Sequence, residues 1–256
     1  MFRIKRTFNI QLIKKCFSFA FNAIFPVHCS CCRVTLKASS VPPYLCKDCF
    51  SNITLLKNKN CIRCGKSLDI SPASLICPEC ISGKKFVFKE FFAPLTYSEY
   101  GRAIVHNLKF HSTPSAAKTI SELIYAKLAS NKKLDCIDAF VPAPISKERL
   151  AKRTYNQTEL ICRHLSKKTG KPVVKALKKI KHTVPQSTLS GKDRLTNLDG
   201  SIIFNKKCTL PENIAFIDDV YTTGSTVRTC CEILKNNGGK NIYVLCACIN
   251  TKRCQE

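Results

Sequence analysis

Acidic residues are scarce in this chain of 256 residues. Asp and Glu together number 17 against 42 Lys and Arg, which gives a formal net charge of +25. A surface so short of carboxylates favours a polyanionic partner, with nucleic acid as the first expectation and an anionic membrane surface as the second. A compositional bias spread over solvated faces would give the same count, because net charge alone reports no sequence or groove recognition.

A long hydrophobic run is also missing. The apolar stretch from Cys16 to Phe25 is much shorter than the roughly 20 residues that a membrane-spanning helix needs. Basic residues flank it, as in a signal peptide, but the apolar residues from Ile10 to Ile24 recur on one face of a helix. We therefore expect a lead helix over residues 1–27 that packs, or touches a membrane surface weakly, and no transmembrane segment elsewhere.

Cysteine, in contrast, is abundant and regularly spaced. Eight of the 18 cysteines form four Cys-x-x-Cys pairs, namely Cys29/Cys32, Cys46/Cys49, Cys61/Cys64 and Cys77/Cys80. Two such pairs can present four thiolates tetrahedrally to Zn²⁺, so four pairs predict two zinc sites. Because four thiolates leave no open coordination position, the predicted role of the zinc is structural.

The spacing leaves several alternatives open at this cysteine-rich segment. The pairs can combine sequentially or interleave, and the neighbours His28 and Cys31 allow a local exchange of ligands. Redox dithiols or disulfides are the alternative to metal. The other ten cysteines lie mostly in apolar segments and are typical of small core residues. Metal thiolates together with many free thiols indicate a reducing, cytoplasmic environment.

Residues 214–226 join an apolar strand to a polar loop. Four apolar residues lead into Asp218 and Asp219, and a helical pattern begins near Val227. The unpaired N–H groups and positive dipole of such a helix start bind phosphate. The loop adds hydroxyl donors and a close backbone approach through Thr222, Thr223, Gly224, Ser225 and Thr226. The carboxylates suit ribose hydroxyls, directly or through hydrated Mg²⁺. A purely structural Asp-rich turn is the alternative, but adjacent buried aspartates are costly unless something uses them.

Alternating strand and helix patterns predict the fold after residue 83. Helices are expected over residues 100–110, 115–130, 154–168 and 227–236, and strands over residues 136–141, 202–204, 213–217 and 242–249. This alternation is typical of a doubly wound parallel α/β sheet, in which ligands bind beyond the carboxyl ends of the strands. We expect three parts: the lead helix over 1–27, a Cys-rich zinc module over 28–82, and an α/β domain over 83–256.

Two further segments carry groups suited to a phosphorylated ligand. The turn Pro142-Ala143-Pro144 is followed by Arg149 and by Arg153-Thr154-Tyr155-Asn156-Gln157, and an Arg fork binds pyrophosphate well. The alternative for these residues is a turn and an ordinary helix N-cap at Thr154. Lys109 can serve a ligand or a helix end. The polar loop over residues 182–200 is either a closing flap or a linker.

The order of residues 214–226 resembles the phosphoribosyl pyrophosphate (PRPP) signature of the type I phosphoribosyltransferases. The resemblance implies that Asp218 and Asp219 hold the ribose hydroxyls and act in catalysis, and that residues 222–226 hold the 5′-phosphate. It also implies that Arg153, together with Mg²⁺, holds the pyrophosphate. Neither a nucleobase pocket nor a general base is recognisable in the sequence.

Nearly the whole chain, from about Pro26 to Ile249, resembles the ComF family of bacterial, cytoplasmic, phosphoribosyltransferase-like proteins connected with competence and DNA uptake. The motifs that carry the resemblance occur in one order: the four Cys-x-x-Cys pairs, residues 108–111, the Pro-x-Pro turn, residues 153–157, then Gln186, Arg194 and Asn197, and the PRPP signature. One departure is Thr154-Tyr155, where relatives usually have Gly-Phe. The aromatic ring is kept, but Thr lacks the backbone freedom of Gly.

The resemblance implies a DNA-uptake accessory protein that binds PRPP. Its basic zinc module would hold single-stranded DNA, and DNA-uptake or recombination proteins are expected partners. The alternative is an active phosphoribosyltransferase that transfers ribose 5-phosphate from PRPP to a nitrogen acceptor.

Overall fold

The computed structural model describes residues 26–37, 40–56, 61–65, 68, 76–83, 86–110, 113–180 and 200–250. The predicted lead helix over 1–27 lies outside these residues except for Pro26 and Val27, which are not helical. The predicted flap over 182–200, with Gln186, Arg194 and Asn197, lies outside them except for Gly200.

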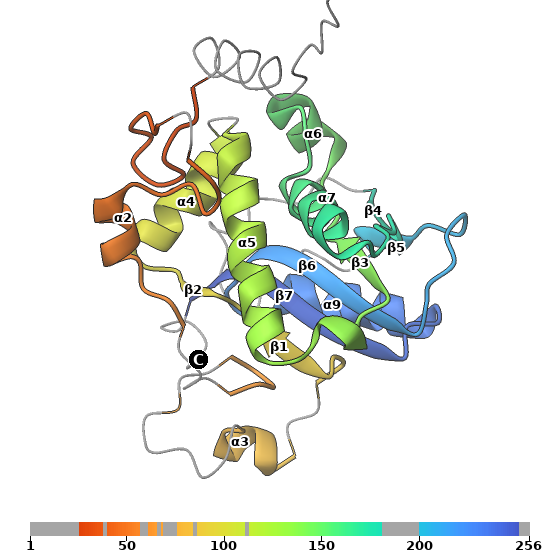
Figure 1. Ribbon diagram of the computed structural model, residues 1–256. Coiled ribbons are helices and arrows are strands. Elements are labelled where there is room, and N and C mark those ends of the chain that lie inside the picture. Colours follow the sequence, from red (N-terminus) through yellow and green to blue (C-terminus); the bar gives the residue numbers. More distant parts are fainter. Residues whose placement is uncertain are drawn as a thin grey trace, which may run out of the picture.

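A five-stranded parallel sheet forms the centre of the described chain (Figure 1). Its strands are β1 (Glu90–Phe92), β2 (Leu95–Thr96), β3 (Ala139–Pro142), β6 (Asn213–Tyr221) and β7 (Asn241–Ile249). The order is β1-β7-β6-β3, and β2 extends the same edge of β7 as β1. Strands β6 and β7 pair from Asn213↔Asn241 to Tyr221↔Ile249. Because helices cover both faces of this sheet, β7 is an almost unbroken apolar run.

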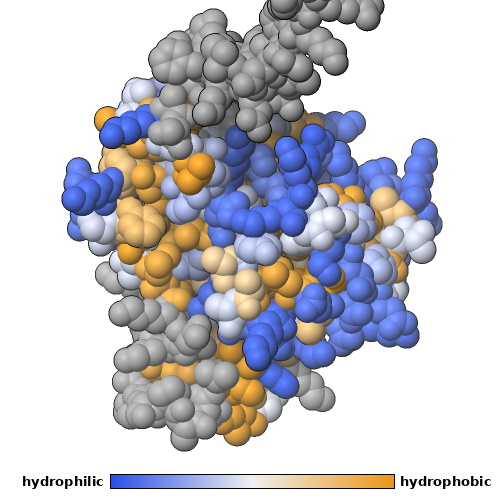
Figure 2. All heavy atoms as spheres, in the orientation of Figure 1, coloured by the Kyte–Doolittle hydropathy of each residue, from blue (hydrophilic) through white to orange (hydrophobic). Residues whose placement is uncertain are grey.

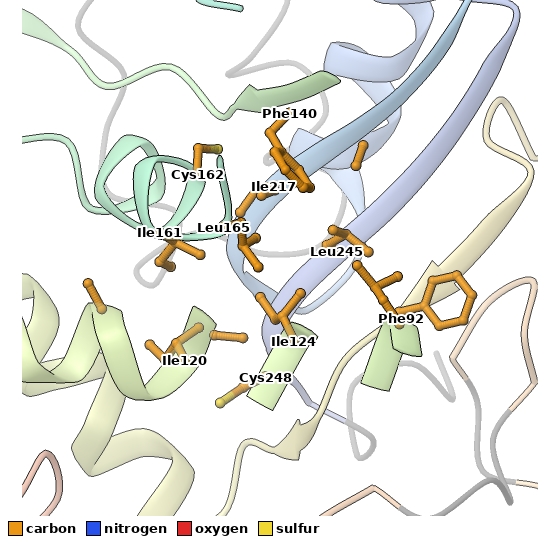
Figure 3. Packing of buried hydrophobic residues seen from close by; sticks show 14 of the residues in the cluster. Phe92, Ile120, Ile124, Phe140, Ile161, Cys162, Leu165, Ile217, Leu245 and Cys248 are labelled. Carbon is orange, nitrogen blue, oxygen red and sulfur yellow. The ribbon is translucent and has the colours of Figure 1, made fainter. Parts of the chain in front are cut away.

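Helices lie on both faces of the sheet (Figure 1). On one face are α4 (Glu99–Phe110), α5 (Pro114–Ser130) and α7 (Gln157–Thr169), and on the other is α9 (Ser225–Asn236). Figure 3 shows residues of α5 and α7, such as Ile124 and Leu165, packed against the sheet residues Ile217 and Leu245. Alternate residues of β6 enter the two cores, which confirms the expected α/β fold class with a parallel sheet.

Short elements complete the described chain. The Cys-rich part contains α2 (Lys47–Asn52) and α3 (Pro78–Ile81), and a 3₁₀ turn η1 (Leu134–Cys136) precedes β3. Helix α6 (Lys147–Arg153) follows β3. Strands β4 (Leu177–Lys179) and β5 (Ile202–Phe204) pair antiparallel in a separate small sheet. Hydrophilic residues gather over α6 and α7, whereas hydrophobic residues gather around α2 (Figure 2).

Several predicted boundaries were wrong. The strand expected over 136–141 begins at Ala139, because Cys136 ends the 3₁₀ turn. The strand expected to end at residue 217 continues to Tyr221, because its pairing with β7 continues. The helix expected over 154–168 is α7, which begins only at Gln157, because Thr154 ends the preceding helix α6 with a φ of 64°.

None of the helices in the described ranges is long and apolar enough to cross a membrane.

Candidate functional site

A cleft of about 620 Å³ opens at the carboxyl ends of β3 and β6. Its walls come from α4, α6, the start of α7, β4 and the loop between β6 and α9. Five cationic side chains line it against two carboxylates; the cations are Lys109, Arg149, Lys152, Arg153 and Lys179, and the carboxylates are Asp218 and Asp219. This excess of positive charge suits a ligand with more than one phosphate group.

Asp219 lies on the face of β6 that is covered by α4 and α7. Its Oδ1 accepts from Lys109 Nζ at 2.8 Å, and its Oδ2 accepts from Gln157 Nε2 at 2.9 Å. Burial acts to raise the pKa of Asp219, but Lys109, Gln157 and Arg153 together lower that pKa below its usual value. Asp219 is therefore an ionised carboxylate with a fixed orientation.

Asp218 lies on the opposite face of the same strand, because neighbouring strand residues alternate. Its Oδ1 accepts from the backbone N–H of Asp219 at 2.8 Å. Burial, and next the charge of Asp219, raise the pKa of Asp218 to about 7, although Lys179 and Lys109 act in the opposite direction. The two adjacent carboxyl groups therefore differ in their protonation near neutral pH.

The loop from Thr222 to Thr226 leads directly into helix α9. The helix begins at Ser225, two residues before the predicted start, and Gly224 is its N-cap with a φ of 77°. Thr223 Oγ1 and Ser225 Oγ are 2.8 Å apart, and residues 222 and 224–226 line the cleft. The structure thus brings the predicted phosphate loop to the same cleft as the two carboxylates.

Gly224 is also required for packing, which the sequence did not show. A Cβ atom at this position would lie 2.5 Å from Tyr221 Oη, and the positive φ would strain it further. The ring of Tyr221 is itself held by Phe91, with ring centroids 4.7 Å apart. The Tyr221 ring therefore packs between Phe91 and the loop at Gly224.

Arg153, the last residue of α6, lines the cleft. Burial lowers the pKa of its guanidinium, and the attraction of Asp219 acts in the opposite direction. The guanidinium carbon lies 5.0 Å from the ring centroid of Phe110, so the cation also contacts an aromatic face. Arg149, one turn earlier in α6, lines the same cleft.

The turn between α6 and α7 is fixed by hydrogen bonds to the Pro142–Pro144 turn. Asn156 caps α7, and both Asn156 Nδ2 and Thr158 Oγ1 donate to Ala143 O at 2.9 Å. The hydroxyl of Tyr155 donates to Leu108 O at the end of α4. The N-cap is thus Asn156, and the alternative of an N-cap at Thr154 does not hold.

Gln157 has a buried oxygen atom without a partner. The side chain lines the cleft, is 8% exposed, and has its orientation fixed by the bond to Asp219. Its Oε1 is the buried side-chain acceptor for which no hydrogen bond is found among the described residues. Such an atom costs free energy unless a bound molecule supplies a donor.

Lys179 is a cleft residue that the sequence did not single out. It ends β4, it lines the cleft, and its charge acts on Asp218. Burial, and then the nearby Arg149, lower its pKa. Strand β4 is only three residues long, so no hydrophobic pattern marked it in the sequence.

The eight predicted metal ligands form two separate clusters. Each cluster combines sequential pairs, with all four sulfur atoms within 4.8 Å of one another; the sets are Cys29, Cys32, Cys46 and Cys49, and Cys61, Cys64, Cys77 and Cys80. Sulfur atoms of different pairs lie 3.7 Å apart in the first cluster and 3.6 Å apart in the second. A tetrahedral zinc site with Zn–S bonds of about 2.3 Å has sulfur–sulfur edges of roughly 3.8 Å, so the geometry fits zinc.

The two clusters share one local design. The backbone N–H of the third cysteine donates to the sulfur of the first, at 3.3 Å from Cys46 to Cys29 and at 3.3 Å from Cys77 to Cys61. Such bonds stabilise a negatively charged sulfur. The cysteines of the described chain are all free of disulfides. Cys31 instead contacts Tyr100 O, at 3.8 Å, outside the cluster.

The first cluster is attached to the sheet domain by polar contacts. Ser30 and Thr119 share a buried hydrogen bond of 2.8 Å, and the N–H of Tyr44 donates to the same Thr119 hydroxyl. Asn107 Nδ2 donates to the carbonyls of Ser30 and Cys31. Helices α4 and α5 therefore hold the cysteine loops in place.

Residues 20–81 match the family described as "Double zinc ribbon domain". Competence protein F of Haemophilus influenzae is 27% identical over 223 residues, which cover 78% of this chain and 95% of the relative. Competence protein ComFC of Streptococcus pneumoniae is 28% identical over 201 residues, which cover 77% and 84%. Together these matches support a ComF-family protein.

Other relatives and solved structures match this chain as well. The Escherichia coli K12 "DNA utilization protein YhgH" is 27% identical, with 87% of this chain and 97% of the relative covered. A Giardia lamblia APRTase complexed with 9-deazaadenine matches 56% of this chain and 70% of its own, with 21% identity and a TM-score of 0.35. A glutamine PRPP amidotransferase from B. subtilis matches 56% of this chain and 30% of its own, with 13% identity and a TM-score of 0.37.

Proposed function

We propose that this ComF-family protein is an accessory factor of DNA uptake in natural transformation, and that its α/β domain binds PRPP. The relatives named competence proteins and DNA utilization proteins support the first part. The convergence of the acidic pair, the Thr222–Thr226 loop and Arg153 on one cleft supports the second part. This convergence is the observation that carries the proposal.

Each part of the ligand has a matching group in the cleft. The N–H groups at the start of α9 and the loop hydroxyls bind the 5′-phosphate, aided by the helix dipole. Asp218 and Asp219 accept from the ribose hydroxyls. Arg153 and Arg149 bind the pyrophosphate, because planar guanidinium groups form paired bonds with phosphate oxygens.

Mg²⁺ fits this cleft as an ion that binds together with the ligand. Two carboxylates supply too few oxygens for a dedicated protein site, and Mg²⁺ usually combines one or two carboxylates with substrate phosphates and water. Among the described residues the groups of three or more potential ligands are the cysteine clusters. When bound, the ion would neutralise pyrophosphate charge, and Asp218, which accepts a single backbone hydrogen bond, would be the carboxylate that helps to hold it.

A thermal-shift experiment tests the proposal. Wild-type protein with Mg²⁺ and PRPP should melt at a higher temperature than without ligand, because the ligand binds the folded state. Asp218→Asn with Asp219→Asn should remove this shift. Asp135→Asn, an exposed carboxylate of the 3₁₀ turn, is the matched control and should keep it. No shift in the wild-type protein would refute PRPP binding.

The second candidate is an active phosphoribosyltransferase. In that reaction an acceptor nitrogen forms a bond to ribose C1 while the bond from C1 to the pyrophosphate oxygen breaks. Pyrophosphate leaves with the bonding electrons, and the nitrogen loses its proton to water. The orientation of Asp219 by Lys109 and Gln157 favours this candidate, since a fixed carboxylate stabilises positive charge at the sugar.

We also propose the remaining partners and the setting of the protein. The basic cysteine module, residues 28–82, holds zinc in both clusters and contacts single-stranded DNA, while residues 83–256 form the PRPP-binding domain. Proteins of DNA uptake or recombination are partners. The free thiols of the described chain support a cytoplasmic location, where thiols stay reduced.

A further inference from the structure

The second cysteine cluster is packed against the central sheet. Its first two cysteines belong to residues 61–65, and the backbone N–H of Phe91 in β1 donates to Ile62 O of this segment at 2.7 Å. At Gly65 a Cβ atom would lie 2.7 Å from Phe91 Cε1 and 2.4 Å from Ile249 Cδ1. Because these distances are far shorter than van der Waals contact, the Gly65 backbone lies directly on both side chains.

The Phe91 ring continues this contact toward the phosphate loop, residues 222–226. The rings of Phe91 and Tyr221 are tilted by 56° with centroids 4.7 Å apart, an arrangement that aromatic pairs favour. A Cβ atom at Gly224 would lie 2.5 Å from Tyr221 Oη and 2.8 Å from Tyr221 Cζ. Gly65, Phe91, Tyr221 and Gly224 therefore form an unbroken row of contacts from the second cluster to the loop.

The first cysteine cluster is attached to a different part of the domain. Its loops bond to Thr119 of α5 and Asn107 of α4, on the face of the sheet that these helices cover. Phe91 and Tyr221 belong instead to the core on the α9 side, where they are 5% and 7% exposed. Rings buried to this extent cannot shift without displacing their neighbours. The second cluster is thus the one whose packing reaches the phosphate loop.

We propose that the second cysteine cluster positions the phosphate loop, with Phe91 and Tyr221 as the positioning residues. A cluster held by metal keeps residues 61–65 in one conformation, and the close-packed rings pass this constraint to Gly224. That the loop binds phosphate rests on the proposed function, whereas the packing that positions it does not. Because coupling between two sites is reciprocal, a phosphate ligand in the loop also strengthens zinc binding by the second cluster.

Hydrogen exchange of the loop amides in the ligand-free full chain, followed by mass spectrometry, tests the positioning without a ligand. Phe91→Leu keeps an apolar side chain but loses the ring contact with Tyr221, so the amides of residues 222–227 should exchange about tenfold faster. Phe92→Leu is the matched control, since Phe92 is the next residue of β1, is equally buried at 5%, and enters the core on the α5 side. It should leave the exchange of these amides within about twofold of wild type.

Calorimetric titration with ribose 5-phosphate measures the consequence for binding. Cys61→Ser, which removes a ligand of the second cluster, and Phe91→Leu should each weaken binding about tenfold. Phe92→Leu should bind within about twofold of wild type.

Zinc removal by a competing chelator tests the coupling in the opposite direction. Cys29→Ser leaves the second cluster as the intact one of the two, so its zinc is measured alone. Saturating ribose 5-phosphate should raise the chelator concentration needed to remove this zinc by about the same factor of ten. Adding Phe91→Leu to Cys29→Ser should abolish this protection, and adding Phe92→Leu should keep it.

Several results would overturn the positioning role. They are unchanged loop exchange in Phe91→Leu, equal increases in Phe91→Leu and Phe92→Leu, wild-type affinity for ribose 5-phosphate in Cys61→Ser, and zinc retention that bound ligand does not alter. If Phe91→Leu alone speeds loop exchange but the wild-type protein binds neither ribose 5-phosphate nor PRPP, the positioning role stands and the proposed function fails.

Discussion

At the scale of single residues, Asp218 and Asp219 are neighbours in sequence with different environments. Asp219 is paired with Lys109 and Gln157, and its pKa is lowered. Asp218 accepts one backbone hydrogen bond, and its pKa is raised to about 7 by burial and by Asp219. Asp219 therefore holds Lys109 and the start of α7 in place, whereas Asp218 has oxygen atoms left to accept a hydroxyl or a hydrated ion.

The raised pKa of Asp218 predicts a pH effect on the stability of the ligand-free protein. The folded pKa lies above that of the unfolded chain, so stability present at low pH is lost as the pH rises through about 7. Because the unfolded chain loses this proton well below pH 6, Asp218→Asn should already be the more stable protein at pH 6. Its advantage over wild type should grow by roughly 1 kcal/mol more between pH 6 and pH 8 and then level off.

Urea unfolding of both proteins at the two pH values measures this difference. Effects of pH on other groups, including the zinc thiolates, are common to both proteins and cancel. A difference between the variants that is independent of pH would show that Asp218 does not titrate in this range. Asp219→Asn should instead destabilise the protein at both pH values, because it weakens the pair with Lys109.

At the scale of secondary-structure elements, the loop before α9 depends on Gly224 for two reasons. Its φ is 77°, and a Cβ atom would lie 2.5 Å from Tyr221 Oη. Gly224→Ala should lower the free energy of unfolding by about 1–2 kcal/mol for the left-handed backbone alone. It should also remove stabilisation by PRPP, because the displaced loop no longer presents its N–H groups to the phosphate.

Gly238→Ala is the control for this change. Gly238 also has a positive φ, of 108°, but a Cβ atom there would meet nothing within 4 Å. Thermal melting with and without PRPP should show destabilised proteins in both cases, with the ligand-induced shift kept in Gly238→Ala alone. Equal loss of the shift in both variants would mean that general strain, rather than the loop geometry, is responsible.

Much of the element structure could be predicted because the signals were local. The apolar runs predicted β6 and β7, and the Thr-Thr-Gly-Ser-Thr turn predicted the start of α9 to within two residues. The extension of β6 through Asp218 and Asp219 could not be predicted, since pairing with β7 imposes it against the low β-propensity of Asp. Likewise Thr154 adopts a φ of 64° without the freedom of Gly, because the next two residues, Tyr155 and Asn156, bond the turn to the carbonyls of Leu108 and Ala143.

Site residues followed the same division between local and distant signals. Asp218, Asp219, Arg153 and the loop were identified from contiguous motifs. The partners of Asp219 come from α4 and α7, which are 110 and 62 residues away in sequence, so their convergence required the fold. The pairing of cysteines also needed the structure, because spacing fits sequential and interleaved clusters equally well.

At the scale of the whole molecule, the two cysteine clusters predict the metal content. The chain should carry two zinc ions, measured by elemental analysis of the purified protein. Cys29→Ser and Cys61→Ser should each retain one, because the clusters share no ligand. Cys208→Ser removes a cysteine outside both clusters and should retain two.

Loss of the first cluster should also destabilise the α/β domain. Its loops are bonded to Thr119 of α5 and Asn107 of α4, so Cys29→Ser should lower the melting temperature of the whole protein. A variant that lost zinc but melted like wild type would show that the module and the domain unfold independently. Retention of two zinc ions in Cys29→Ser would contradict the assignment of ligands.

The net charge of +25 makes salt dependence the decisive test for single-stranded DNA binding. Each phosphate contact contributes about −0.7 to the slope of log K against log salt. If the cysteine module binds the strand, replacing its exposed Lys47 and Arg63 by Gln should reduce the slope by about 1.4 and weaken binding at low salt. Lys206→Gln with Lys207→Gln removes the same charge from exposed positions after β5 and should change neither quantity. Equal effects of the two pairs would mean that charge spread over the whole surface, rather than the module, attracts the DNA.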